Sequence, residues 1–173
     1  MRTQPFILAM QAEGREWVTT FSEAARNSFD YVFTDAMTFL DHKGRRTHLW
    51  VNKEVIIDDE QAYMDMMLDR ICSVLEEPVD MYVNSCFLPD AMSDRYDMFW
   101  TEERIDRFVN ALAKSGKALE INELYHIPNK AIIQKAKAAG VKFTFGSNNI
   151  TPWFVECNSI LRRINRLLNN YSS

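Results

Sequence analysis

Residues 118–149 read ALEINELYHIPNKAIIQKAKAAGVKFTFGSNN, and this stretch decides the fold class. It opens with an apolar run, ALEIN, at residues 118–122 and closes with a second run, VKFTFG, at residues 141–146. Between the runs, the apolar residues of AIIQKA have helical spacing, and Gly140 stands where a helix must stop before the next strand. The stretch therefore predicts two parallel strands joined by a helix.

The same alternation extends upstream. Three further apolar runs lie at residues 6–11 (FILAMQ), 30–34 (DYVFT) and 79–84 (VDMYVN). All five runs are mostly apolar rather than strictly alternating, which is typical of parallel strands covered on both faces. The chain is therefore predicted to be an α/β protein with a parallel (βα)5 sheet and helices outside. Five strands are too few for a closed β/α barrel, which usually has about eight. The sheet is therefore either open and doubly wound or part of a larger β/α barrel.

Five groups of apolar residues at helical spacing supply the expected helices. Thr101, followed by two glutamates, is the expected start of the helix that carries Ile105 and Phe108. The helix expected around residues 157–168 carries three arginines on its other faces and is either a surface helix on the sheet or a basic docking helix. The groups are Trp17, Val18, Phe21 and Ala25; Tyr63, Met67, Ile71 and Val74; Ile105, Phe108, Val109 and Leu112; Ile132, Ile133 and Ala136; and Cys157, Ile160, Leu161, Ile164 and Leu168.

Composition excludes several classes of protein. The chain has 173 residues, 20 Lys and Arg against 24 Asp and Glu, and a net charge of −4. That length predicts one domain, and that charge argues against broad binding to nucleic acid or an anionic membrane. The five glycines are too scattered for a GxGxxG or Walker loop.

The cysteines and the first apolar run indicate the compartment. Cys72, Cys86 and Cys157 are odd in number and lie far apart, which favours free thiols in a reducing compartment. The apolar run at residues 6–10 is too short for a signal peptide or a membrane span. These features predict a soluble, cytoplasmic protein.

Polar residues follow each predicted strand, and the carboxyl ends of parallel strands meet at one edge. Carboxylate and amide oxygens gathered there suit a hard divalent cation, a polyol or a phosphate. As an alternative, Asp35 and Asn84 cap the loops that follow them, and Glu120 pairs with a buried Lys or Arg. The polar residues in question are Gln11 and Glu13; Asp35; Asn84; Glu120 and Asn122; and Ser147, Asn148 and Asn149.

The three histidines do not form a metal motif. His42, His48 and His126 have neither HxH nor HExxH spacing, so a dedicated zinc cage is not encoded. His126 lies six residues past Glu120 and is the histidine most apt to face the site, although a surface-loop position fits it equally. No Ser or Cys stands in a nucleophile elbow, which leaves acyl transfer unsupported.

Residues 118–149 also resemble the last two β/α units of the PHP (polymerase and histidinol phosphatase) family of metal-dependent phosphoesterases, which commonly read LEIN…A…G…GSDAH there. LAMQAEGREW resembles the family strand that ends in a glutamate, DYVFTDAMTF resembles its DYVIGSVH, and VDMYVNSCFLP resembles the strand that ends in HP. The resemblance spans nearly all of residues 6–150. It implies that residues 1–173 form a single PHP-like domain, a partial version of the family's distorted seven-stranded β/α (TIM-like) barrel that lacks its first two strands and HxH.

The resemblance also implies roles for individual residues. Glu13 matches the metal-bridging glutamate, whereas Met37 and Ile150 stand at two family histidines. Asn84 stands at the histidine of HP and Asn148 at the aspartate of DAH. Because Asn offers one neutral oxygen and Met and Ile offer no hard ligand, Mg²⁺, Mn²⁺ or Zn²⁺ would bind weakly or not at all. The implied metal ligands are Glu13, Asp35, Asn84 and Asn148; the catalytic carboxylates are Glu13, Asp35 and Glu120; the substrate contacts are Asn122, His126 and Asn149.

Three hypotheses about function follow. The first is a PHP-like phosphoesterase relative with a degraded metal site, weakly active or inactive, whose open sheet edges are covered by self-association or by a missing N-terminal segment. The second is a non-catalytic module that binds a carbohydrate or polyol through asparagines and through Trp50, Trp100 and Trp153, if these rings are not simply packed in the core. The third is a metal-free acid/base enzyme that uses Glu13 and Glu120, which requires carboxylates within roughly 5–10 Å of each other.

Overall fold

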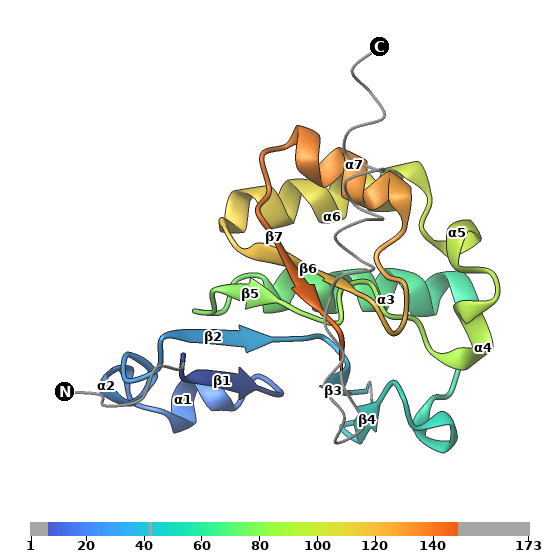
Figure 1. Ribbon diagram of the computed structural model, residues 1–173. Coiled ribbons are helices and arrows are strands. Elements are labelled where there is room, and N and C mark those ends of the chain that lie inside the picture. Colours follow the sequence, from blue (N-terminus) through green and yellow to red (C-terminus); the bar gives the residue numbers. More distant parts are fainter. Residues whose placement is uncertain (1–6, 42, 149–173) are drawn as a thin grey trace, which may run out of the picture.

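The computed structural model describes residues 7–41 and 43–148, which form an open five-stranded parallel sheet with helices beside it (Figure 1). Neighbouring strands follow the order β1-β2-β5-β6-β7, and each neighbouring pair is parallel. The predicted α/β class and five-stranded parallel sheet are therefore confirmed. The sheet is not closed, and β1 and β7 form its two edges. The strands are β1 Ala9–Ala12, β2 Tyr31–Thr34, β5 Met81–Tyr82, β6 Ala118–Asn122 and β7 Phe143–Gly146.

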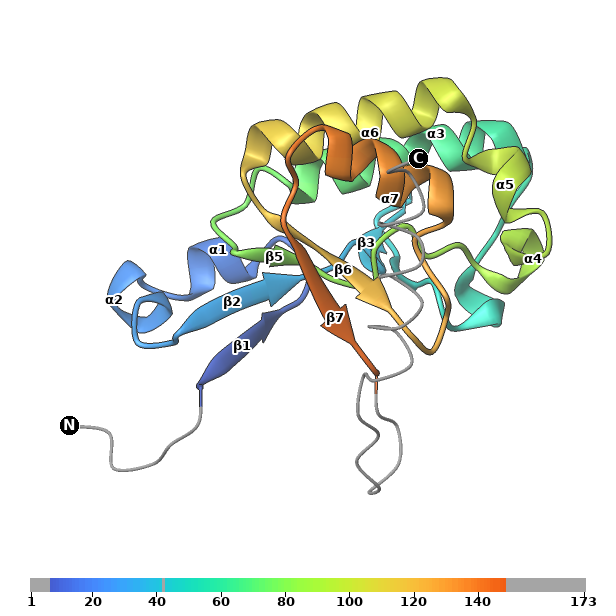
Figure 2. The same ribbon diagram turned by 45° about the horizontal axis from the view of Figure 1, so that its top comes forward.

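Three longer helices pack against one face of this sheet (Figures 1 and 2). They are α3 Glu60–Val74, α6 Glu102–Ser115 and α7 Lys130–Ala138. Their predicted apolar stripes face the hydrophobic core, and Tyr63 and Val74 at the two ends of the α3 stripe are only partly buried. Phe108 and Leu112 of α6 are fully buried with Leu119 of β6. Two helices of four residues, α4 Asp90–Ser93 and α5 Tyr96–Phe99, connect β5 to α6.

The apolar stripe at residues 17–25 forms two short helices rather than the single helix expected. Helix α1 spans Trp17–Thr20 and helix α2 spans Glu23–Arg26. Phe21 is extended between them, with φ −97° and ψ 130°, and the Ser22 hydroxyl accepts a hydrogen bond from the Ala25 N–H as a new N-cap. The cap ends one helix and begins the next, so Phe21 leaves the core and is 42% exposed. The predicted helix around residues 157–168 lies outside the described residues.

A β-hairpin that the sequence analysis did not predict follows β2. Strands β3 Thr38–Leu40 and β4 Arg46–His48 pair antiparallel in a separate two-stranded sheet. At the turn, Gly44 has a φ of 74°, and an Asp41 carboxylate oxygen accepts from the backbone N–H groups of Lys43 and Arg45. The stretch DHKGRRTH is too polar to reveal a strand by hydrophobic alternation, so only its turn residues carry the signal.

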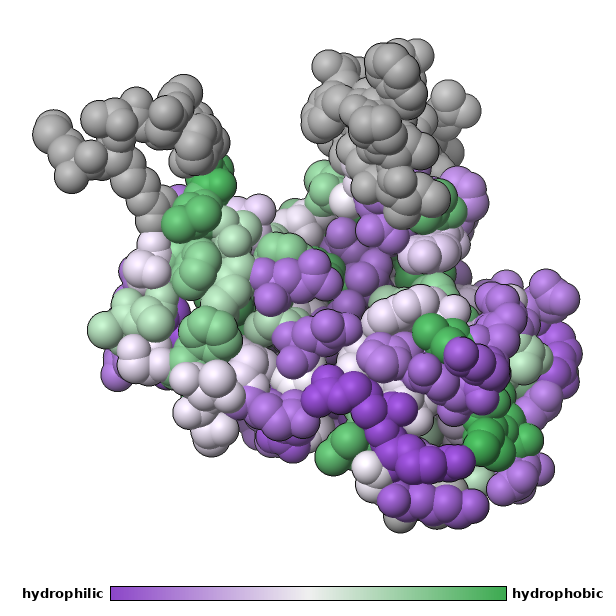
Figure 3. Space-filling view, turned by 90° about the horizontal axis from the view of Figure 1, so that it is seen from below, coloured by the Kyte–Doolittle hydropathy of each residue, from purple (hydrophilic) through white to green (hydrophobic). Residues whose placement is uncertain are grey.

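The expectation that both sheet faces are covered is wrong for the part of the chain that the structure describes. Fully buried residues alternate with half-buried ones along the strands: Val32 with Tyr31 and Phe33, and Leu119 with Ala118. The register aligns the half-buried residues on one face, which no described helix covers (Figure 2). Seen from below, apolar side chains gather toward the β1–β2 side of the molecule, whereas most of the remaining surface is polar (Figure 3).

Thr101→Ala is expected to lower the free energy of unfolding by about 1 kcal/mol, because the Thr101 hydroxyl caps α6 by accepting from the Arg104 N–H. Urea denaturation measures the loss. Thr101→Ser keeps the hydroxyl and is expected to stay close to the parent protein. Equal losses in both variants would show that the cap does not stabilise the helix.

Candidate functional site at the carboxyl rim of the sheet

Four of the predicted site residues form one hydrogen-bonded row across the carboxyl ends of β2, β5 and β6. The Asn84 side-chain amide donates to Asp35 Oδ2 over 3.1 Å. Asn122 Nδ2 in turn donates to Asn84 Oδ1 at 3.1 Å and to Glu120 Oε2 at 3.4 Å. The Asn84 backbone N–H closes the row by donating to Glu120 Oε2 over 2.7 Å. We call Asp35, Asn84, Asn122 and Glu120 the rim row.

The backbone at the strand ends is shaped to make these contacts. Asn84, two residues after the end of β5, has a φ of 47°, which turns its N–H and its amide toward β6 and β2. His126 and Asn148, which follow β6 and β7, also have positive φ values of 56° and 49°. Left-handed backbone is uncommon outside glycine and clusters at ligand-binding sites. Three such residues at consecutive strand ends therefore mark this rim as a functional candidate.

Burial raises the pKa of both carboxylates in the rim row. Asp35 is only 7% exposed, and loss of hydration raises its pKa more than the hydrogen bonds from the Met37 N–H and Asn84 lower it. Glu13 repels its charge and raises the pKa further. For Glu120 the largest cause is again burial, opposed by hydrogen bonds from Asn84 and Asn122 and reinforced by the Asp35 charge. Both groups therefore hold a proton more readily than exposed carboxylates do.

The capping alternative is partly realised at Asp35, whereas the side-chain carboxylate of Glu120 accepts hydrogen bonds from Asn84 and Asn122, neither of which is basic. Asp35 Oδ1 accepts from the Met37 N–H at 2.9 Å and so shapes the β2–β3 loop while Oδ2 belongs to the rim row. The Glu120 carboxylate accepts from backbone and amide N–H groups rather than from a buried Lys or Arg. Asp35 thus both caps a loop and belongs to the candidate site.

Gly146, Thr38 and Ser85 support the site and were missed by sequence reasoning. A Cβ atom on Gly146 would lie 1.9 Å from Glu120 Oε1, so the carboxylate rests against the bare backbone of β7. The Thr38 hydroxyl donates to Glu13 Oε1 over 2.6 Å, and the fully buried Ser85 hydroxyl donates to the Glu120 carbonyl oxygen over 2.7 Å. The sequence shows that Gly146 ends a strand. Its contact with the Glu120 carboxylate depends on the pairing of Asn122 with Gly146, which the sequence does not show.

The two carboxylates of the acid/base hypothesis belong to strands that are not neighbours. Glu13 follows β1, whereas Glu120 lies in β6, and β2 and β5 stand between them. Three strand spacings of about 4.8 Å amount to about 14 Å, which exceeds the separation that glycosidase-type carboxylate pairs need. Glu13 is exposed and accepts a hydrogen bond from the Thr38 hydroxyl; it acts on Asp35 through its charge and is not part of the hydrogen-bonded rim row. This geometry argues against the third hypothesis.

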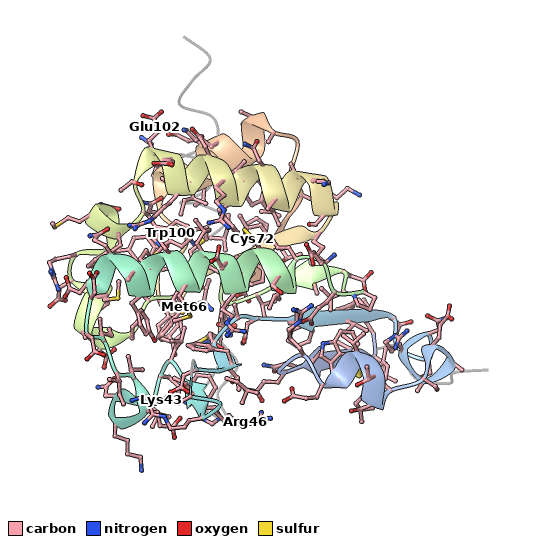
Figure 4. The ribbon with its side chains drawn as sticks, turned by 180° about the vertical axis from the view of Figure 1, so that it is seen from behind. Lys43, Arg46, Met66, Cys72, Trp100 and Glu102 are labelled. Carbon is pink, nitrogen blue, oxygen red and sulfur yellow. The ribbon has the colours of Figure 1, made fainter. Side chains whose placement is uncertain are left out.

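The remaining predicted residues have different positions. His126 is exposed in the β6–α7 loop, and Asn148 is half-buried just after β7. Trp50 is 48% exposed beside His48, whereas Trp100 is buried in the core between α3 and α6, where it packs on Phe108 (Figure 4). Trp100 is therefore a core residue and not a sugar-stacking surface. Asn149, Ile150, Trp153, Cys157 and His42 lie outside the described residues.

The described residues do not fit the metal cluster that the family resemblance implies. Within residues 7–41 and 43–148, no group of three or more His, Cys, Asp or Glu is placed to hold a metal ion. The rim row gives a reason, because amide N–H groups of Asn84 and Asn122 lie against the carboxylates that a bridging cation would need. Hydrogen bonds from neutral amides thus take up oxygens that would otherwise serve as hard ligands.

No family model and no curated protein matches the chain. In the part that the structure describes, no helix is long and apolar enough to cross a membrane. Cys72 and Cys86 are free, in agreement with the expectation for these two thiols.

Proposed function

We propose that the rim row binds a polyol or a similar hydroxyl-rich ligand without chemical turnover, on a scaffold that corresponds to the carboxyl-terminal five β/α units of a PHP-like barrel. The observation that carries the proposal is the direct hydrogen bonding of Asp35, Asn84, Asn122 and Glu120 across three strands. Ligands of open α/β sheets bind beyond this same edge.

The chemistry of the rim row suits hydroxyl groups. Carboxylate oxygens accept hydrogen bonds from a ligand hydroxyl, and an asparagine amide both donates and accepts. A diol can therefore replace the contacts between neighbouring members of the row with one donated and one accepted bond. Because Asp35 and Asn122 are buried, these bonds form away from bulk water, where they are electrostatically stronger.

Binding is favoured over hydrolysis by the state of the carboxylates. Metal-assisted phosphoester hydrolysis needs a cation that lowers the pKa of a bound water toward neutrality. In the rim row, both carboxylate oxygens of Asp35 and Oε2 of Glu120 accept hydrogen bonds from amide and backbone N–H groups instead. The residues support recognition of a ligand and offer no activated nucleophile.

Asn84→Gly is expected to weaken polyol binding about tenfold, because it removes the amide that links Asp35 to the rim row. Glycine tolerates the φ of 47° at this position, so the backbone turn is retained. Calorimetric titration of the full chain with glucose, myo-inositol and glycerol, in buffer containing EDTA, measures the effect. Asn110→Ala removes an exposed amide from α6 and is the matched control.

Two outcomes would overturn the proposal. If none of the three polyols binds, the rim row is a structural feature only. If Mn²⁺ or Mg²⁺ produces turnover of p-nitrophenyl phosphate that Glu13→Gln abolishes, the chain is a metal-dependent phosphoesterase, and the hydrolase hypothesis replaces this one.

A further inference from the structure

A cavity of about 230 Å³ adjoins the rim row on the side of Asp35. Its walls come from the β1–α1 loop, the β2–β3 loop, the β3–β4 hairpin and the second half of α3. Asp35, a member of the rim row, lines this cavity. Thr38, whose hydroxyl donates a hydrogen bond to Glu13, lines it as well. Asp35 is therefore the residue at which the rim row and the cavity meet.

Three arginines from three different elements line this space, which we call the arginine cavity. Arg46, on the hairpin below α3 (Figure 4), lies with its Nη2 3.2 Å from Glu16 Oε1. Arg15 lies with its Nε 3.5 Å from Glu77 Oε1. Both guanidinium groups are about half exposed. Glu16 is exposed too, and an ion pair exposed on both sides contributes little free energy, whereas Glu77, the partner of Arg15, is buried. Arg46 can therefore exchange Glu16 for a stronger anion at small cost, while Arg15 keeps its pair with Glu77 and adds positive charge to the wall.

Of the three arginines, Arg70 gives the strongest support for anion binding. Its Nη2 donates to the Leu40 carbonyl oxygen over 2.9 Å, and its guanidinium carbon lies 5.8 Å from the centroid of the Phe39 ring. Among the ion pairs of the described residues, none involves Arg70. A guanidinium carries five N–H donors, so this half-buried cation is held in place with donors to spare.

We propose that the arginine cavity binds the acidic group, a phosphate or a carboxylate, of a polyol whose hydroxyls contact the rim row. The polyol half of this inference rests on the proposed function, whereas the acidic half rests on the arginines. The cavity lining carries three arginines against two carboxylates, Glu16 and Asp35. Apolar side chains, among them Phe39 and Val74, form much of the remaining wall, and an apolar wall strengthens the attraction between a cation and an anion.

Titration calorimetry on the full chain tests the inference with glucose, gluconate, glucose 6-phosphate and inorganic phosphate as probes. At low salt, the acidic group is expected to tighten binding about tenfold relative to glucose, with the gain shrinking as salt is added. Arg70→Met is expected to remove that gain and to leave glucose binding unchanged, while Arg70→Lys retains part of it. Arg107→Met removes a half-exposed arginine that pairs with Asp69 and is the matched control.

Each outcome separates this inference from the proposed function. If glucose binds but neither acidic probe binds more tightly, or if the gain persists in Arg70→Met, the arginine cavity is not an anion site and only the rim row stands. If inorganic phosphate binds in an Arg70-dependent manner while glucose does not bind, the cavity stands and the polyol proposal fails. A gain for glucose 6-phosphate alone identifies phosphate as the acidic group, and equal gains identify any oxyacid. Should Arg70→Met fail to fold in a thermal melt, Arg46→Met provides the same test.

Discussion

Gly146→Ala is expected to lower the free energy of unfolding by about 3 kcal/mol, at the upper end of the usual cost of overpacking. The added Cβ would lie 1.9 Å from Glu120 Oε1 and 2.8 Å from Glu120 Cδ. The carboxylate cannot withdraw freely, because its other oxygen accepts from the Asn84 N–H over 2.7 Å. The substitution therefore disrupts the rim row as well as stability, and chemical denaturation together with glucose titration measures both losses.

A double substitution identifies the cause of this loss. Glu120→Ala removes the clashing atoms, so the cost of Gly146→Ala should largely disappear when it is measured in the Glu120→Ala background. Gly116→Ala is the contrasting control, because its φ of 70° resists a side chain although no atom lies within 4 Å of the added Cβ. It is expected to cost about 1 kcal/mol, and Glu120→Ala should not rescue it. Equal costs of Gly146→Ala in both backgrounds would show that Glu120 does not rest on β7.

Glu120→Gln is expected to stabilise the protein at neutral and alkaline pH, by about 2 kcal/mol, because it replaces a desolvated carboxylate with a neutral group of similar shape. Burial raises the pKa of Glu120 above its ordinary value of 4.5, so the folded protein binds this proton more tightly than the unfolded chain does. The unfolded chain loses the proton first, and the stability of the parent protein therefore falls as pH rises from the ordinary value through the raised one. Below both values the carboxyl is neutral in either state, and the advantage of Gln vanishes.

Urea denaturation of both proteins between about pH 4 and pH 8 measures this difference. Burial raises the pKa of Asp35 as well, so both proteins keep the part of the pH dependence that Asp35 causes. Glu103→Gln, which removes an exposed carboxylate from the first turn of α6, is the control and should show no comparable gain at high pH. A Glu120→Gln variant that is less stable than its parent at pH 8 would mean that the hydrogen bonds to the carboxylate outweigh its burial.

Much of the fold was predictable from local pattern. The five strands and the helices α3, α6 and α7 have apolar residues at a spacing that identifies them, and their order requires parallel pairing. Strand ends were less accurate: the run at residues 79–84 contains a strand of only two residues, because Asn84 turns into left-handed backbone. The β3–β4 hairpin was not predicted, because its residues are mostly polar and its two strands pair only with each other.

The residues of the candidate site could be predicted from the sequence, but the hydrogen bonds between them could not. Asp35, Asn84, Asn122 and Glu120 were identified because each stands at the end of a strand in a parallel sheet. Glu13 meets the same criterion, yet it is exposed and contacts Thr38 rather than the rim row. The arginine cavity could not be foreseen, because Arg15, Arg46 and Arg70 come from a loop, a hairpin and a helix that have no fixed spacing in sequence.

The sequence by itself determined the order of the strands along the chain, their parallel direction and the set of polar side chains at one rim. Hydrophobic spacing and the handedness of crossover connections are local properties, so they can be read before the chain folds. Only the tertiary structure decided that, in the part of the chain that it describes, one face of the sheet is half exposed. It also decided that Glu120 rests on the backbone of Gly146 and that amide N–H groups donate to the carboxylates of the rim row. These features depend on register and on contacts between residues up to 49 positions apart, which no local pattern encodes.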